Sequence, residues 1–357
     1  IDPLEVMDEF GTDALRFTLA TSSSPGNDMK LVPARIVGNR NFANKIWNAS
    51  RFVIGQTAEV TTEIPALDSL APKTLADRWI VSRALRLTGE VTRLMDDFQL
   101  GEAGRQIFDF IWSEYCDWYI EVAKVQLHEV TQRKNTALIL RAVLDTSLRL
   151  LHPFMPYVTE EVWQHLMHDV HPAGWSAEAL IIAPWPEPAA EIAERLMDEA
   201  AEADFALLRE IVTRIRDARN QAGVEPAKRV KAIFAAGGKT ALLKKQAALI
   251  EQLARTEAPV IERKLAAKPE QAMALVAGSV EVYLPLAGLL DLARERARLE
   301  AEMVAAQEAI ARARKMLDNP NFVGRARPDV VQRERDNLAA AQDTLKKLEI
   351  RRAELGL

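Results

Sequence analysis

Two heptad-patterned segments near the end of the chain constrain its fold more than any other feature. In the first, apolar residues recur in alternating steps of four and three, the seam of a coiled coil; they are Leu299, Met303, Ala306, Ile310, Ala313 and Leu317. The second repeats the pattern at Leu338, Ala341, Leu345 and Leu348. Between them, NPNFVGRARP (residues 319–328) breaks both helices with prolines and a glycine. We therefore expect residues 291–357 to form an antiparallel coiled-coil hairpin.

The charge of this hairpin differs from that of the remaining chain. Residues 291–357 contain 14 Lys or Arg and 12 Asp or Glu, whereas the whole chain of 357 residues has a net charge of -5. Basic residues gather near the predicted tip, at Arg312, Arg314, Lys315, Arg325, Arg327, Arg333 and Arg335. A basic tip on a projecting arm is suited to RNA phosphates. The alternative is a solvated coiled coil with ordinary flanking charges.

A second basic surface is expected on a helix predicted over residues 34–53. One side is apolar at helical spacing and should be buried; it carries Ile36, Ala43, Ile46, Ala49 and Val53, flanked by Phe42 and Trp47. The opposite side has no carboxylate and carries Arg35, Arg40, Asn41, Asn44, Lys45, Asn48 and Arg51. Solvated helices usually mix Lys with Glu, so this side is better suited to phosphates and base edges. A soluble helix that is merely basic is the alternative.

Helical periodicity fills most of the chain before residue 183. Helices are predicted at residues 4–10, 13–18, 76–98, 103–130 and 136–151, and from Thr159 to about Met167. The helix over 103–130 has an aromatic-rich side, for which core packing is the main explanation. We expect residues 31–183 to form an antiparallel helical bundle.

The pattern changes after the bundle. Three prolines in APWPEPAA, residues 183–190, indicate a boundary, and residues 184–225 should be a linker and a long helix, 191–222. A period of two at 229–234 and 279–286, with a helix over 240–254 between them, predicts a small α/β subdomain over residues 226–290. The expected fold class is therefore mainly α, with a helical bundle, this subdomain and the coiled-coil hairpin.

Composition excludes several classes of protein. The single cysteine, Cys116, rules out a disulfide framework and a multi-thiolate metal site. With no signal peptide and no bilayer-spanning apolar run, the sequence predicts a cytoplasmic protein without membrane contact. Because the first residue is Ile1 and not Met, we expect a piece of a longer protein.

No motif predicts a catalytic centre. Gly237-Gly238-Lys239-Thr240 lacks the first glycine of a phosphate loop, since Ile233 occupies that position. The spaced histidines have no second set of ligands for a metal; they are His165, His168 and His171. We expect no catalytic residue, metal or cofactor within this chain.

Several segments resemble a known enzyme family. GTDALRF (11–17), RNFANKIWNASRF (40–52), EYCDWYIE (114–121) and LRLLHPFMPYVTEEVWQ (148–164) resemble class I aminoacyl-tRNA synthetases, in the region after their KMSKS loop. VEVYLPLAGLLD (280–291) and NPNFVGRARPDVV (319–331) narrow the resemblance to the C-terminal part of bacterial valyl-tRNA synthetases. The isoleucine family ends instead in a Cys-rich zinc module.

The resemblance implies a role for each part. Residues 1–30 would be the connection that follows the KMSKS loop, residues 31–183 the anticodon-binding domain and residues 291–357 a tRNA-binding arm. Implied partners are valine tRNA and the N-terminal catalytic and editing domains, in a monomer whose full-length form uses ATP and Mg. Implied anticodon contacts are Arg35, Arg40, Asn44, Lys45, Asn48, Arg51 and a stacking Phe52, with Glu114 and Trp118 completing the pocket.

Three alternatives remain at this point. The chain could be the matching region of an isoleucyl- or leucyl-type synthetase, or a stand-alone RNA-binding protein without catalytic activity. It could also be a structural scaffold that dimerises through its coiled coil, which would not require the Arg/Asn side of the helix over 34–53.

Overall fold

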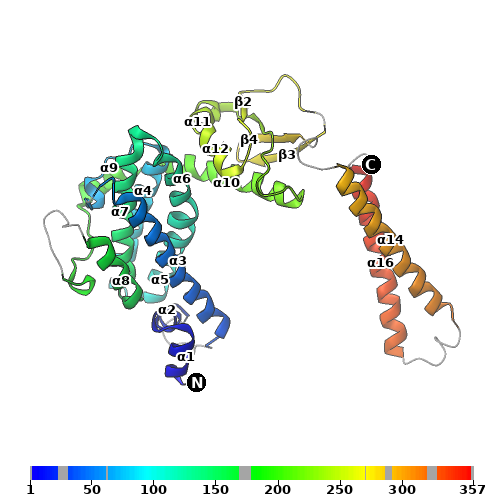
Figure 1. Cartoon of the computed structure of the whole chain (residues 1–357), viewed down its shortest axis with the longest axis horizontal. Coiled ribbons are helices and arrows are strands. Elements are labelled where there is room, and N and C mark those ends of the chain that lie inside the picture. Colours follow the sequence, from blue (N-terminus) through cyan, green and yellow to red (C-terminus); the bar gives the residue numbers. More distant parts are fainter. Residues whose placement is uncertain are drawn as a thin grey trace. The chain divides into compact units, whose positions relative to one another are not determined.

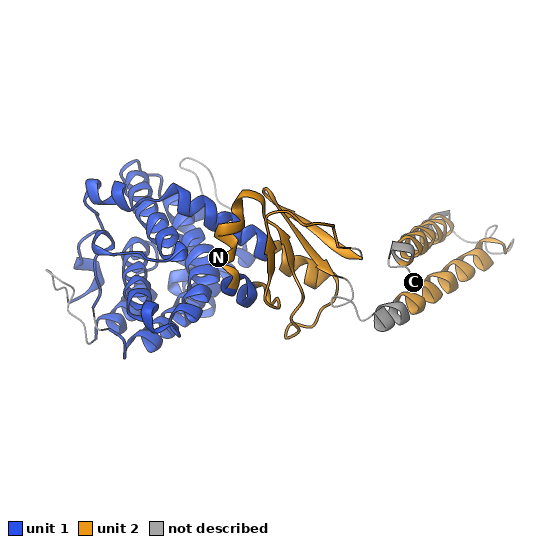
Figure 2. Cartoon of the chain, turned by 90° about the horizontal axis from the view of Figure 1, so that it is seen from above, with its two compact units in different colours: residues 1–212, 248–253 blue, residues 213–247, 254–357 orange. Residues whose placement is uncertain are grey.

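The computed structural model describes residues 2–22, 31–61, 63–168, 178–269, 271–285, 292–319 and 328–354. The chain divides into two compact units, residues 1–212 with 248–253 and residues 213–247 with 254–357 (Figure 2). Helices dominate, and the described strands form one small sheet, so the predicted mainly-α fold class is confirmed. None of the helices in the described ranges combines the length and apolarity needed to cross a membrane.

The first unit is a helical bundle (Figure 1). Its α-helices are α1 Pro3–Phe10, α2 Thr12–Ser22, α3 Pro33–Thr57, α4 Leu75–Asp96, α5 Leu100–Asp109, α6 Ile120–Gln126, α7 Val130–Leu151, α8 Pro156–Met167, α9 Ala190–Leu196 and the first part of α10 Glu199–Gln221. Short 3-10 turns lie at η1 Leu67–Ser69 and η3 Leu180–Ile182, and η2 Phe110–Tyr119 is π-helical.

Three predictions about these helices were wrong in detail. The helix expected over 191–222 is divided, because the Asp198 carboxylate accepts a hydrogen bond from the Ala201 N–H (2.8 Å) and caps a new helix, α10. Thr159 caps nothing; it lies inside α8, which begins at Pro156, and its hydroxyl donates to the Met155 carbonyl (2.7 Å). The helix expected over 103–130 changes to π-helical geometry at η2.

A largely buried polar network joins α4, η2, α6 and α7. Thr74 and Asp77 form a capping box at the start of α4. The Asp77 carboxylate also accepts hydrogen bonds from the Tyr119 hydroxyl (3.0 Å) and the Asn135 amide (3.1 Å). The Gln126 amide donates to the Thr74 hydroxyl (2.8 Å). These polar groups are satisfied without water, which fixes the four elements in one register.

α3 packs with its apolar side on this bundle. Ile36, Phe42, Ile46 and Val53 are all at most 2% exposed, as the helical spacing predicted. The buried Asn39 amide donates to the Thr18 hydroxyl of α2 (2.7 Å). Toward the other end of α3, two further polar residues meet: the Arg141 guanidinium of α7 donates to the Thr57 hydroxyl (3.0 Å). Both ends of the helix are therefore held by directional contacts.

The second unit contains a four-stranded sheet in the order β2-β1-β4-β3. The strands are β1 Ile233–Ala235, β2 Val260–Glu262, β3 Ala272–Ala277 and β4 Val280–Pro285; β1 and β2 are parallel and the other pairs antiparallel. The turn η4 Gly237–Lys239 and helices α11 Thr240–Lys245 and α12 Ala247–Ala254 follow β1, with residues 248–253 of α12 belonging to the first unit. Sequence periodicity predicted β1 and β4 but missed β2, of three residues, and β3, whose run AMALVA has no polar alternation.

The last two helices pair along their lengths. α14 Leu292–Leu317 and α16 Pro328–Glu354 lie side by side (Figure 1). The seam residues Leu299, Met303, Ala306 and Ala313 of α14 are buried, as is Val331 of α16. The predicted coiled-coil hairpin is confirmed over the described residues.

The stacked pair of Trp79 and Phe205 allows a test of the bundle. Their ring centroids lie 4.0 Å apart at 15°, and Phe205 is fully buried. We expect Phe205→Ala to lower the free energy of unfolding of the first unit by about 3–5 kcal/mol, because it removes a large core side chain. Urea unfolding followed by helical circular dichroism measures this. Tyr157→Ala, at an aromatic residue that is 65% exposed, is the control and should change stability by about 0.5 kcal/mol or less.

Candidate nucleic-acid interface

The exposed side of α3 presents unpaired basic and amide side chains. Arg35, Asn44, Asn48 and Arg51 are exposed. Within the described part of the chain, none of these four side chains forms a hydrogen bond or an ion pair with another protein group. A partner would therefore not have to break internal bonds to reach them. Asn44, Asn48 and Arg51 recur at steps of four and three on one side of the helix, and we call these three residues the α3 face. Arg35, nine residues before Asn44, lies on another side of α3 beside residues of α2 and α5, so its predicted role in anticodon binding stays a prediction.

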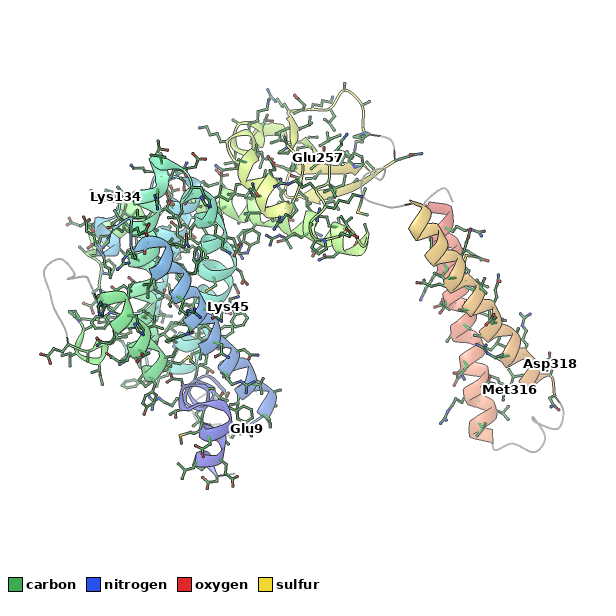
Figure 3. The ribbon with its side chains drawn as sticks, in the orientation of Figure 1. Glu9, Lys45, Lys134, Glu257, Met316 and Asp318 are labelled. Carbon is green, nitrogen blue, oxygen red and sulfur yellow. The ribbon has the colours of Figure 1, made fainter. Side chains whose placement is uncertain are left out.

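Two predicted contacts lie on the flank of α3 toward η2 and α6. The Lys45 ammonium, labelled in Figure 3, forms an ion pair with Asp117 and lies 4.1 Å from the ring centroid of Trp112. The Lys124 ammonium lies 5.4 Å from the ring centroid of Phe52. Both predicted residues are half-buried and already engaged, so they line the α3 face with restrained side chains.

Arg40 is restrained in a similar way near the start of α3. Its guanidinium carbon lies 5.8 Å from the ring centroid of Phe10 in α1, and the side chain is half-buried. Arg40 thus contributes positive charge beside the α3 face with less freedom than Arg51.

The remaining two predicted contacts, Glu114 and Trp118, interact with residues of other helices. Glu114 accepts two hydrogen bonds of 2.9 Å from the Arg83 guanidinium of α4, and this pairing is the main cause of the raised pKa of Arg83. Trp118 is 9% exposed and packs edge-on against Phe205 of α10, with ring centroids 6.4 Å apart. A role in RNA binding for Glu114 and Trp118 stays a prediction, and the function proposed below is based on α3.

Sequence reasoning missed three residues that shape this surface. Trp112, Asp117 and Lys124 meet Lys45 or Phe52 because η2 is π-helical and continues directly into α6. Helical periodicity assumes a repeat of 3.6, so it places side chains wrongly across ten residues with i→i+5 bonding. The aromatic density of EYCDWY was the available signal.

The basic residues at the tip of the arm are exposed. Met316 and Asp318, labelled in Figure 3, mark the end of α14. Arg312, Arg314 and Lys315 precede this end, and Arg333 and Arg335 lie in the first turns of α16. Arg312 pairs weakly with Glu308 at 3.6 Å. The predicted residues Arg325 and Arg327 lie outside the described residues.

The described residues of the first unit form no evident metal site or reactive centre. Within the described ranges, no group of three or more His, Cys, Asp or Glu side chains is arranged to hold a metal ion. The arrangement of unpaired Arg and Asn side chains on a rigid helix is suited to binding a charged, hydrogen-bonding polymer.

Comparison with known families agrees with this chemistry. Residues 77–234 match the model described as the anticodon-binding domain of tRNA ligase, and residues 291–356 match the valyl tRNA synthetase tRNA binding arm. The chain thus combines a match to the anticodon-binding domain of tRNA ligases with a match to the tRNA binding arm of valyl tRNA synthetases.

The relatives are consistent with these matches. Valine–tRNA ligases of Carboxydothermus hydrogenoformans and Bacillus cereus are each 40% identical over 95% and 99% of this chain, and that of Geobacillus stearothermophilus is 37% identical over 99%. The chain spans 37–39% of the length of these relatives. Similarity to a solved LeuRS–tRNA–LeuAMS complex of Agrobacterium radiobacter K84 is weak, with a TM-score of 0.40, 22% identity, and coverage of 56% of this chain and 22% of that one.

The chain belongs to the valine–tRNA ligase family and corresponds to its tRNA-binding portion. The arm separates it from the isoleucyl- and leucyl-type alternatives.

Cys116 allows a test of the packing behind Lys45. Burial raises the pKa of this thiol to about 12, although the nearby Lys45 opposes the shift. We expect alkylation by iodoacetamide at about pH 8 to be about a hundredfold slower, or more, in the folded chain than in concentrated guanidinium, because the reactive thiolate is scarce. Mass spectrometry over time measures the rate; similar rates in both conditions would contradict the packing around η2.

Proposed function

We propose that this chain binds valine tRNA and recognises its anticodon through the α3 face. The observation that supports the proposal is the presence of three exposed Arg and Asn side chains, unpaired among the described residues, on one side of a helix held at both ends. This helix precedes the match to the anticodon-binding domain, which begins at residue 77, but it packs on α7 and α8, which lie within that match. Anticodon bases are single-stranded and unstacked, so their edges are open to such groups.

Each type of side chain has a defined role in this proposal. The Asn44 and Asn48 amides both donate and accept hydrogen bonds, as base edges require. The Arg51 guanidinium binds phosphates or base acceptors, while Arg35, at the start of α3 and on another side of it, binds a phosphate. Lys45, Arg40 and Phe52 line the same surface in restrained positions and contribute charge and an aromatic edge.

The arm contributes affinity and not sequence selection. Its exposed tip residues Arg312, Arg314, Lys315, Arg333 and Arg335 are all cationic, which suits contacts to phosphates. This part of the proposal rests on the match of residues 291–356 to a tRNA-binding arm.

The chain would act as part of a valine–tRNA ligase that carries out the ATP-dependent valylation of tRNA. By the family relationship, ATP and Mg would be bound by domains other than those in this chain, and the catalytic residues would lie there as well. A monomeric, cytoplasmic enzyme is our expectation for that larger assembly.

Replacing Arg51 tests the α3 face directly. Arg51→Ala should weaken binding of a hairpin RNA with a valine anticodon by about 1–3 kcal/mol, the scale of one base contact. Fluorescence anisotropy at fixed salt measures the affinity. The matched control is Lys134→Ala, because this basic residue of α7 lies apart from Lys45 in Figure 3.

The same assay separates base reading from general attraction. A hairpin with a changed anticodon should bind the unmutated chain as poorly as the valine hairpin binds the Arg51 variant. Equal affinity for both hairpins would reject anticodon recognition and leave a nonspecific basic surface.

Neutralising the arm tip tests the second binding surface. Changing Arg312, Arg314, Lys315, Arg333 and Arg335 to Gln should weaken cognate and noncognate tRNA by a similar factor. The slope of log affinity against log salt should flatten by somewhat under one unit for each phosphate that the variant no longer neutralises. Lys346→Gln with Lys347→Gln, in the opposite half of α16, is the control. An unchanged salt slope in the tip variant would show that the arm is a solvated coiled coil.

A further inference from the structure

A pocket of about 520 Å³ lies between α3 and α8, on the opposite flank of α3 from Lys45. It is lined by Trp47, Ser50, Arg51, Ile54, Gly55, Val162, His165 and His168. Its size is within the range of pockets that hold small planar ligands. Arg51 belongs both to this pocket and to the α3 face, so the two surfaces are continuous.

The walls combine an aromatic ring with a cation. Trp47 is 36% exposed and counts among the exposed large hydrophobic residues. Its ring meets that of His165 edge-on, with centroids 6.1 Å apart. This contact holds the indole in place while leaving part of its surface open. Arg51, which follows Trp47 by one helical turn and is unpaired among the described residues, lines the same pocket. An aromatic ring beside an arginine is the pairing on which single-stranded bases stack.

A polar group in the pocket lining has no partner among the described protein groups. Ser50 is 1% exposed, and its Oγ is buried without a hydrogen bond, although helical serines commonly bond to the carbonyl four residues earlier. Leaving a buried hydroxyl unsatisfied costs free energy, and such a group in a native structure calls for an explanation. A ligand edge or a water carried with it would satisfy this hydroxyl.

We propose that this pocket holds one unpaired nucleobase of the tRNA anticodon loop, stacked on Trp47, with Arg51 at its rim and the Ser50 hydroxyl reading its edge. The proposal rests on the function proposed above and adds a specific subsite to it. The apolar remainder of the lining, Ile54 and Val162, suits the face of a base and not a phosphate.

A glycine makes the pocket testable without damage to the core. A Cβ atom at Gly55 would meet no other atom within 4 Å, so the helix backbone accepts a side chain there, and Gly55→Leu places a branched apolar group in the pocket. Gly89 in α4 is also helical and open, and it does not line this pocket, which makes Gly89→Leu the matched control. Both substitutions replace a helical glycine by a better helix former, so neither should destabilise the bundle.

The experiment measures the affinity of the complete 357-residue chain for hairpin RNAs with a valine anticodon. One RNA is intact, and in the others each loop nucleotide in turn is abasic. Gly55→Leu should weaken binding of the intact hairpin about tenfold, the scale of one stacked base, while Gly89→Leu binds normally. At one loop position, removing the base should weaken binding to the unmutated chain about tenfold relative to the intact hairpin. Removing the same base should not weaken binding to the Gly55 variant further, because the pocket is already filled.

Other outcomes would overturn the subsite. No base enters the pocket if the Gly55 and Gly89 variants bind the intact hairpin with equal affinity. The same conclusion follows if, at every loop position, the loss of affinity from the abasic nucleotide adds to the loss from Gly55→Leu. If thermal melting shows that Gly55→Leu is unstable, Trp47→Leu decides instead, since it removes the stacking ring and should show the same non-additivity. Failure of the proposed function is recognised separately, because the unmutated chain would then bind valine and changed anticodons equally.

Discussion

The burial of one side of α3 is the constraint on which the rest of the interface depends. Ile36, Phe42, Ile46 and Val53 fix which side of the helix faces the bundle. Two polar contacts, Asn39 with Thr18 and Thr57 with Arg141, then fix its position along and around its axis. Because the apolar stripe alone tolerates small rotations, these directional bonds supply the precision that base recognition requires.

The surface around α3 is divided by how freely its side chains move. On one flank Lys45 and Phe52 are restrained by Asp117 and Lys124, whereas Asn44, Asn48 and Arg51 have no internal partner among the described residues. Restrained groups give up little conformational entropy on binding but must share their charge with a neighbour. Side chains without an internal partner keep their full charge for a ligand but lose more conformational entropy when they bind it. At the arm tip Arg312 pairs with Glu308 over a long 3.6 Å contact, and the described basic side chains there are exposed, which agrees with a role in electrostatic attraction.

Sequence alone predicted the elements with strong periodicity and missed those set by tertiary contacts. The buried stripe of α3 and the seam from Leu299 to Ala313 follow directly from spacing, because burial repeats with the helix. The break at Asp198 is partly local, since Asp198 caps the Ala201 N–H, but the apolar periodicity runs through it and does not report a cap. The short strand β2 pairs with β1, and η2 bonds through Tyr115 and Tyr119 to other helices, so both depend on partners distant in sequence. For the same reason spacing identified the exposed side of α3 but not the α3–α8 pocket, whose second wall comes from Val162 and His165. The same limit applies to Glu114, whose partner Arg83 is on another helix.

The π-helical segment has a consequence for how this bundle can change over evolutionary time. A turn closed by i→i+5 bonds holds more residues than an α-turn, so η2 contains surplus chain within an otherwise regular helix. Deleting one residue there would let the segment relax to α geometry while the flanking helices α5 and α6 stay continuous. The bond from Tyr119 to Asp77 would then hold the bundle, and the side chains before it would rotate about the axis. Such a single-codon deletion would change the residues beside Lys45 and, because Phe110, Ile111 and Tyr115 are buried, would also change which side chains of η2 pack in the core.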